Sequence, residues 1–180
     1  MRSAQDVIDF WFVQHDKDDW FGGKAEFDVA LAERFADTHP RVALAEAWEW
    51  RQTPEGRLAE IIVLDQFSRQ LHRGSAEAFA QDKMAVALAQ EAIAAGADQA
   101  LPLERRMFVY MPFMHAESLV IQEEGVRLFQ QFDADLQKFM TGHRDTIARF
   151  GRFPFRNKAL GRTSTPEEEA YMAEQGDRVF

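Results

Sequence analysis

Helix start and stop signals recur along the whole chain, whereas strand signals do not. Side chains that cap helix N-termini stand before several apolar stretches, often with proline at the next position, and glycines follow those stretches. The clearest signals, in chain order, are Ser3 with Asp6, Thr53 with Pro54, Gly96, and Thr165 with Pro166 and Glu168. No two-residue hairpin turn and no sustained polar–apolar alternation interrupts them. The sequence therefore predicts an all-α protein.

The spacing of these signals predicts about nine helices joined by short loops. Long helices are expected over 54–72, 75–96 and 114–140, a further one over 142–150, and an interruption at Pro112. Consecutive antiparallel helices would pack side by side as stacked hairpins. With 180 residues, 46% of them hydrophobic, the chain is expected to form a single domain over 1–180, with an irregular Arg-rich segment at 151–164.

Composition narrows the classes of function. A net charge of −9 argues against nucleic acid as a partner. Because no apolar run approaches 18 residues, no membrane partner is expected, and acids at positions 6 and 9 make the first twelve residues unlike a secretory signal. We therefore expect a cytoplasmic protein. The absence of cysteine excludes a disulfide scaffold, a zinc–thiolate site and a cysteine nucleophile.

A first candidate segment is EIIVLDQFSRQLHRG, residues 60–74. Apolar residues surround the predicted helix on almost every side, so it should be buried and should carry Asp65 into or beside the core. A buried carboxylate must be paired or neutral, and Arg69, four residues later, is the nearest cation. Asp65 and Arg69 form either a pair that fixes the helix register or part of a cavity wall.

A second candidate segment is PFMHAESLVIQEE, residues 112–124. His115, Ser118 and Gln122 share one face of the predicted helix and should be half-buried beside its apolar stripe. Glu117 should point to a different face. His115 and Glu117 are two residues apart, which is a poor spacing for metal ligands on a helix, so no metal site is predicted.

A third candidate segment concentrates positive charge. Residues 143–162 contain six Lys or Arg residues against Asp145 alone, which is +5 and leaves −14 on the other 160 residues. Phenylalanines in the segment should anchor it to the helices. Arginine forks suit carboxylate and phosphate groups, so the segment forms either a site for a small anion or a set of internal ion pairs.

Two functions from different classes, and a third without a ligand, fit these segments. The first is a binding protein in which the three segments line one pocket for a small anionic molecule or peptide. The second is a hydrolase or lyase with His115 or His143 as the base. The third is a structural or interaction protein. No cofactor is predicted, and the sequence does not predict an oligomeric state. The expected ligand-binding residues are Asp65, Arg69, Arg73, His115, Ser118, Gln122, His143, Arg144, Arg152, Arg156, Asn157 and Arg162.

Three long strings resemble one family. They are LDQFSRQLHRGSAEAFAQDKMA (64–85), YMPFMHAESLVIQEEGVRLF (110–129) and HRDTIARFGRFPFRNKALGRTSTPEEEAYM (143–172), and DFWF (9–12) precedes them. Together they resemble the bacterial-type domain-of-unknown-function family numbered 924, over essentially the whole chain. The resemblance implies an all-helical fold similar to tetratricopeptide-repeat superhelices, without a clear repeat signature. It implies no activity, so no catalytic residue can be assigned.

The chain departs from that family at one place. The family often has serine directly after the histidine of the second string, whereas this chain has Ala116 there. This departure argues against a serine nucleophile at this position.

Overall fold

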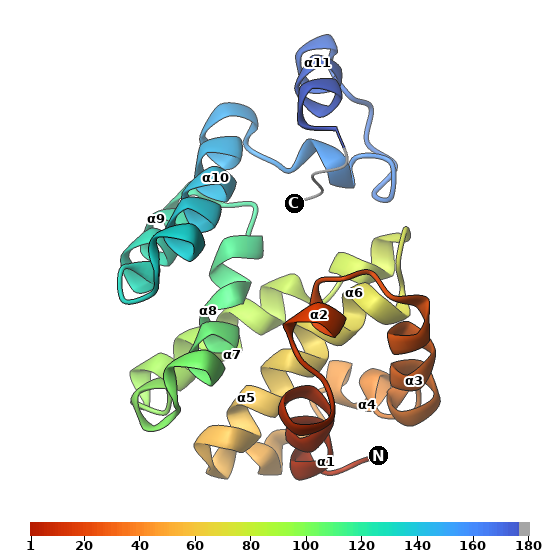
Figure 1. The fold of residues 1–180 in the computed structure, drawn as a ribbon, viewed down its shortest axis with the longest axis vertical. Helices are drawn as coiled ribbons and strands as arrows, with labels where there is room; N and C mark the ends of the chain where they lie inside the picture. Colours follow the sequence, from red (N-terminus) through yellow and green to blue (C-terminus); the bar gives the residue numbers. More distant parts are fainter. Residues whose placement is uncertain (177–180) are drawn as a thin grey trace. The chain divides into compact units, whose positions relative to one another are not determined.

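The computed structural model describes residues 1–176, and within them it contains helices and no β-strand (Figure 1), which confirms the all-α prediction. The chain divides into two compact units. The N-terminal unit holds residues 1–73 and 77–112, and the C-terminal unit holds 74–76 and the residues from 113 onward. The single domain expected from the sequence stays a prediction. No helix in residues 1–176 is long and apolar enough to cross a membrane.

The N-terminal unit is built from short helices around an aromatic core. Its α-helices are α1 (Ala4–Asp9), α2 (Lys17–Trp20), α3 (Ala25–Phe35), α4 (His39–Ala43), α5 (Pro54–Ile62), α6 (Ser68–Leu71), α7 (Asp82–Ala94) and the start of α8 (Leu103–His115). Trp11 and Trp20 stack with ring centroids 5.5 Å apart, and Phe67 and Phe108 pack against Trp11. Burial of large rings of this kind contributes strongly to the stability of a core.

Short helical segments of other types connect these helices. The 3₁₀ segments are η2 (Trp48–Gln52), η4 (Ala76–Phe79), η5 (Asp98–Ala100) and, in the C-terminal unit, η6 (Pro154–Arg156). Two π-helical segments, η1 (Phe10–Gln14) and η3 (Val63–Phe67), extend α1 and α5. The helix expected over 54–72 therefore exists, but its middle turn is a π-helix. The π-helix is rare and is found mostly as single turns inside α-helices, frequently at functional sites.

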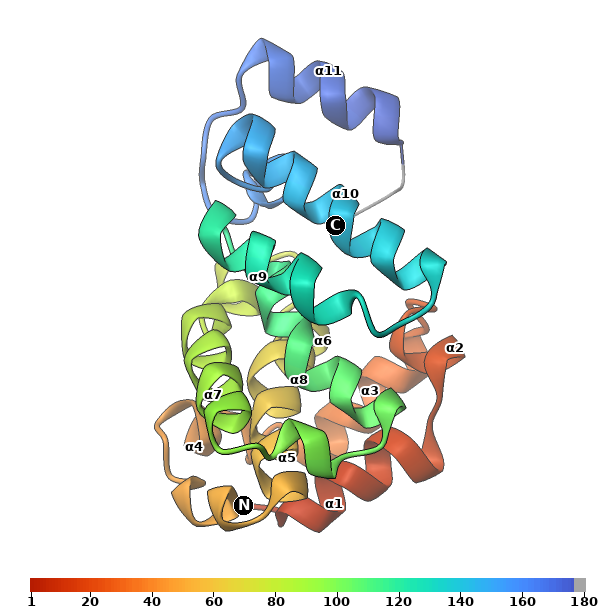
Figure 2. The same ribbon diagram turned by 90° about the vertical axis from the view of Figure 1, so that its left-hand side faces the viewer.

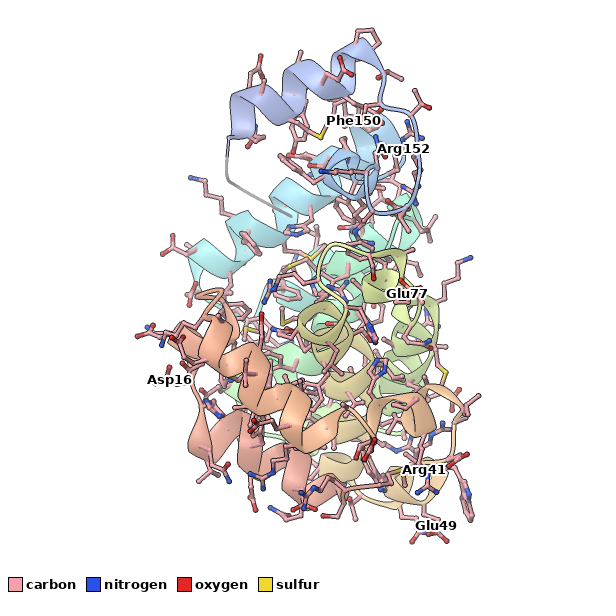
Figure 3. All side chains as sticks on the ribbon, turned by 90° about the vertical axis from the view of Figure 1, so that its right-hand side faces the viewer. Asp16, Arg41, Glu49, Glu77, Phe150 and Arg152 are labelled. Carbon is pink, nitrogen blue, oxygen red and sulfur yellow. The ribbon has the colours of Figure 1, made fainter. Side chains whose placement is uncertain are left out.

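The C-terminal unit contains the end of α8, then α9 (Leu119–Phe129), α10 (Ala134–Phe150) and α11 (Pro166–Gln175). Helices α9 and α10 are antiparallel neighbours, and α11 runs antiparallel to α10 (Figure 2). Gly125 allows the close approach of α9 and α10, because a Cβ there would lie 2.7 Å from the Met140 side chain. Phe150 is the last residue of α10, and Arg152 follows it after Gly151; Figure 3 labels both side chains.

Two sequence predictions about these helices are wrong. Pro112 lies inside α8 and does not interrupt it, and its neighbours Met111 and Phe113 are buried. The helix expected over 114–140 is broken twice, at 116–118 and at 130–133. Asp133 accepts a hydrogen bond from the Leu136 backbone N–H (2.9 Å) and so starts a new helix, which continues through 142 to Phe150.

Helix caps agree with the sequence signals. Ser3 with Asp6 and Thr165 with Glu168 form complete capping boxes, and Thr53 caps α5. Gly96 has a positive φ of 70° after α7, as a C-terminal cap requires.

Helix α4 ends in the same way without a glycine. Ala45 has φ of 60°, its N–H donates to Val42 O (2.8 Å), and the Glu46 N–H donates to Arg41 O (3.0 Å). An L-residue is strained in this region whereas glycine is not. We expect Ala45→Gly to raise the free energy of unfolding by about 0.5–1 kcal/mol in urea titrations followed by tryptophan fluorescence. Ala95→Gly, at a right-handed φ of −81°, should give no gain, and an equal gain would contradict this explanation.

Candidate functional site

Asp65 and Arg69 form a buried pair in the N-terminal unit, as the sequence predicts. Asp65 is 1% exposed, and the Arg69 Nη1 lies 3.3 Å from its carboxylate and also donates to its backbone carbonyl. The Arg69 Nη2 lies 3.1 Å from Asp82, and the Gln66 amide donates to Asp65 (2.6 Å). Burial acts to lower the pKa of Arg69, but the two carboxylates outweigh it and raise that pKa. Gln66 and Asp82 are not among the residues predicted from the sequence.

Arg73 lies at the end of the same stretch and pairs elsewhere. Its Nη2 and Nε donate to Asp28 of α3 at 2.9 and 3.0 Å, and its side chain is largely exposed. A pair of this kind ties two surface segments together and leaves the guanidinium engaged.

In the C-terminal unit, the Glu117 carboxylate accepts hydrogen bonds from the Arg-rich segment. The sequence predicts instead that Glu117 lies on a different helix face from His115, Ser118 and Gln122. Arg162 donates two hydrogen bonds to its carboxylate, at 2.8 and 2.6 Å, and the Phe153 backbone N–H donates a third at 2.8 Å. Burial alone would raise the pKa of Glu117, but the hydrogen bonds from Arg162 and Phe153 lower it. The break at 116–118 explains the error, because helical periodicity does not hold across it.

A second closed arrangement surrounds Glu168 at the start of α11. Arg152 donates to its carboxylate through Nε (2.6 Å) and Nη2 (2.9 Å), and the Asn157 amide donates to it at 3.3 Å. The Thr165 backbone N–H completes the set at 2.8 Å. These bonds, that from Arg152 foremost, lower the pKa of Glu168 to about 2. Arg152 and Asn157 are thus engaged with an internal acid.

Arg156 and the two candidate histidines lie together in this unit. Arg156 is buried, donates from Nη2 to the His115 carbonyl (3.0 Å) and lies over the Phe153 ring at 4.6 Å. The His115 and His143 ring centroids are 6.4 Å apart, and His143 Nδ1 lies 2.9 Å from the Phe139 carbonyl. The predicted proximity of the second segment to the Arg-rich segment is confirmed by these contacts and by the Glu117 pair.

Gln122 and Ser118 have different surroundings from those predicted. Gln122 is fully buried, and its amide donates to the Met114 and Ala116 carbonyls at 2.6 and 2.8 Å, which terminates α8. Ser118 is exposed at the start of α9, so the prediction that it is half-buried is wrong. Both results follow from the break before α9.

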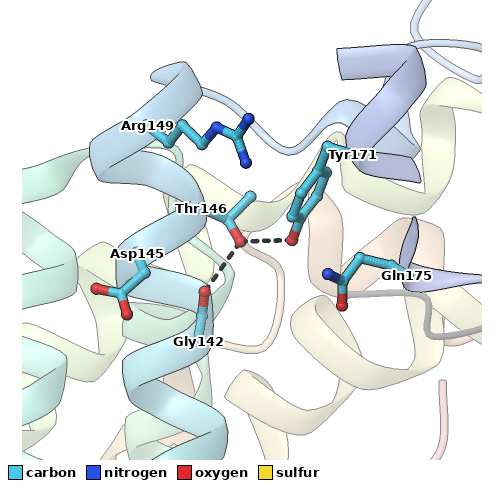
Figure 4. A pocket seen from close by; sticks show the side chains of 6 residues that line it. All are labelled: Gly142, Asp145, Thr146, Arg149, Tyr171 and Gln175. Carbon is cyan, nitrogen blue, oxygen red and sulfur yellow. Dashed lines mark hydrogen bonds between the residues drawn. The ribbon is translucent and has the colours of Figure 1, made fainter. Parts of the chain in front are cut away.

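A cavity between α10 and α11 collects residues that the sequence argument did not select. It has a volume of about 250 Å³ and is lined by Gly142, Asp145, Thr146, Arg149, Tyr171 and Gln175 (Figure 4). Thr146 Oγ1 donates to the Gly142 carbonyl (2.9 Å) and is bonded to the Tyr171 hydroxyl (2.9 Å). The four-residue spacing of Asp145 and Arg149 signals that both lie on one side of a helix, but the cavity itself depends on how α11 packs.

Arg149 and Arg144 are the arginines of the segment with exposed partners. Arg149 bonds Glu167 (2.9 and 3.0 Å), and Arg144 lies 3.2 Å from its neighbour Asp145. The exposed fractions of these four side chains run from 37% to 64%, so water competes for each group. Arg149 is also held over the Phe150 ring (4.7 Å).

The twelve predicted residues fall into two sets. Asp65, Arg69 and Arg73 belong to the N-terminal unit, and the other nine belong to the C-terminal unit. A single pocket that joins the two sets therefore stays a prediction. Among residues 1–176, no group of three or more His, Asp or Glu side chains is arranged to hold a metal ion.

Comparisons with known proteins agree with the resemblance seen in the sequence. A solved structure of a protein of unknown function from Agrobacterium tumefaciens is 41% identical, with a TM-score of 0.91 over 95% of this chain and 97% of that chain. The search of curated proteins gave no match. The family model for DUF924, described as a bacterial protein of unknown function, matches residues 7–176. Because that match spans nearly the whole sequence, the chain belongs to the bacterial family of unknown function DUF924.

Proposed function

We propose that the protein binds a small anionic molecule and that Arg149, in the cavity between α10 and α11, is the cation that holds it. The observation that carries the proposal is the contrast among the arginines of residues 143–162. Arg152 and Arg162 each donate two hydrogen bonds to an internal acid, whereas Arg149 lines a cavity and bonds an exposed glutamate. An exposed ion pair contributes about 0–1 kcal/mol, so an anion can replace Glu167 at little cost.

One serine–histidine pair in the N-terminal unit, Ser68 with His39, is not arranged as a nucleophile with its base. Ser68 Oγ donates to the Leu64 carbonyl (2.6 Å), and His39 Nε2 lies 2.7 Å from the same oxygen. Because the Ser68 hydroxyl proton is donated to the Leu64 carbonyl, His39 Nε2 must donate a hydrogen bond to the Ser68 oxygen. In this arrangement His39 does not act as a base toward the Ser68 hydroxyl. Both side chains are buried, and burial, with His72 nearby, lowers the pKa of His39 to about 4.

We also propose a cytoplasmic location and a helical stack related to tetratricopeptide-repeat superhelices. The chain has no cysteine and so requires no oxidising compartment. Two antiparallel neighbour pairs in the C-terminal unit, α9 with α10 and α10 with α11, support the stacked arrangement (Figure 2).

Anion binding is tested by thermal stability at matched ionic strength. We expect phosphate or acetate to raise the melting temperature of the protein above its value in chloride, by mass action on the folded state. Arg149→Gln should abolish this gain. Arg127→Gln, which removes an exposed arginine of α9 paired with Glu124, is the matched control and should retain it. An equal response to all three salts, or an unchanged gain in Arg149→Gln, would overturn the proposal.

A further inference from the structure

The residues that line the cavity between α10 and α11 include two of opposite charge. Asp145 and Arg149 both line it, and four residues of an α-helix rise about 6 Å. Each bonds a different exposed partner: Asp145 lies 3.2 Å from Arg144, and Arg149 lies 2.9 Å from Glu167. A carboxylate and a guanidinium are thus held apart along one wall.

We propose that the cavity selects a small zwitterion, an amino acid or a dipeptide, whose ammonium group binds Asp145 and whose carboxylate binds Arg149. This inference rests on the proposed function and extends it from an anion to a molecule with both charges. The ligand's ammonium replaces Arg144 on Asp145, and its carboxylate replaces Glu167 on Arg149. Both of the pairs that are exchanged are solvent-exposed, so each exchange costs little.

Three further lining residues, Thr146, Tyr171 and Gln175, carry polar groups that can hydrogen-bond to the uncharged part of such a ligand. Because Thr146 gives its proton to the Gly142 carbonyl, the Tyr171 hydroxyl must donate to Thr146. The Tyr171 oxygen is then left with a free lone pair that accepts from an N–H group. The Gln175 amide lines the same cavity, and no residue among 1–176 hydrogen-bonds to it. The C=O and NH2 groups of the Gln175 side chain can pair with the N–H and C=O groups of a peptide bond.

The guanidinium of Arg149 is positioned before any ligand arrives. It lies over the Phe150 ring at 4.7 Å and over the Tyr171 ring at 5.7 Å. Contacts of this type hold a flexible side chain in one orientation and so reduce the entropy lost on binding.

Volume limits the ligand's size. Drug-sized ligands occupy pockets of about 300–1,000 Å³. At about 250 Å³, this cavity is smaller than that range, and its volume suits an amino acid or a dipeptide.

Isothermal titration with three related probes tests the inference on the full chain. The probes are glycylglycine, its N-acetylated form without the ammonium, and its C-terminal amide without the carboxylate. We expect each modified probe to bind at least about tenfold more weakly than glycylglycine, since each loses a charge-assisted bond. Asp145→Asn should bind the free and acetylated probes equally, and Arg149→Gln should bind the acid and the amide equally. Arg127→Gln should behave as the parent protein.

The outcomes separate this inference from the proposed function. Equal binding of glycylglycine and its acetylated form by the parent protein would overturn the zwitterion and leave anion binding in place. A phosphate-specific stabilisation without any dipeptide binding would do the same. Failure of every anion and every probe to bind would overturn both. Circular dichroism of each variant establishes that a loss of binding is not a loss of fold.

Discussion

Replacing Glu168 with alanine is expected to lower the free energy of unfolding by about 2–3 kcal/mol. The carboxylate is buried, and its removal leaves Arg152 and the Asn157 amide without a shared acceptor. It also removes one half of the capping box with Thr165. The Arg152 side chain is 30% exposed, so water can solvate its guanidinium once Glu168 is removed. The expected loss of unfolding free energy is therefore smaller than for a fully buried pair. Urea titration followed by far-ultraviolet circular dichroism measures it.

The adjacent residue provides a matched control. Glu167 also pairs with an arginine, Arg149, but both side chains are exposed. Glu167→Ala should therefore cost at most about 1 kcal/mol, helix-terminus effects included. Equal losses in the two variants would show that the Glu168 cluster is no more than a surface pair.

The same cluster gives a pH dependence with a defined sign. Folding lowers the pKa of Glu168 from 4.5 to about 2, so its contribution to stability is complete above pH 4.5 and is lost as the pH falls toward 2. The difference in unfolding free energy between the parent and Glu168→Gln should shrink across that interval. A difference that stays constant down to pH 2 would contradict the lowered pKa.

Local patterns predicted the parts of this structure that depend on a few neighbouring residues. The Asp65–Arg69 pair follows from a four-residue spacing inside an apolar helix, and the capping boxes follow from side chains three residues apart. Both are consequences of helix geometry. Asp65 is buried within the π-helical turn at Val63–Phe67, although that turn changes the local spacing.

Partners that are distant along the chain could not be predicted in this way. Glu117 and Arg162 are 45 residues apart, and Arg152 and Glu168 are 16 apart. The sequence showed a cluster of positive charge and left two readings open, an anion site or internal pairs. In the folded protein Arg152 pairs with Glu168, Arg162 pairs with Glu117, and Arg149 lines a cavity. Only the three-dimensional arrangement of these residues separates the two groups.

Replacing Asp65 with alanine is expected to have the larger effect of the two substitutions, lowering the free energy of unfolding by about 3–5 kcal/mol. Asp65 is buried within η3, and Arg69 is 19% exposed, so the guanidinium recovers little hydration when its partner is lost. Asp82 remains as a second partner for Arg69, but the Gln66 amide loses the carboxylate oxygen to which it donates. A buried donor without an acceptor costs about 1–3 kcal/mol by itself, and this cost is included in the expected value.

Tryptophan fluorescence is the appropriate measurement, because all four tryptophans, at positions 11, 20, 48 and 50, lie in the same unit as Asp65. Asp28→Ala is the matched control: it removes the partner of Arg73 on the surface of that unit and should cost less than about 1 kcal/mol. Asp65→Asn should fall between the two, since an amide keeps the size of the carboxylate and lacks its charge. If Asp65→Ala lowers the free energy of unfolding by no more than Asp28→Ala does, Asp65 and Arg69 do not form a buried ion pair that stabilises the fold. The loss of unfolding free energy should therefore be largest for Asp65→Ala, smaller for Asp65→Asn and smallest for Asp28→Ala.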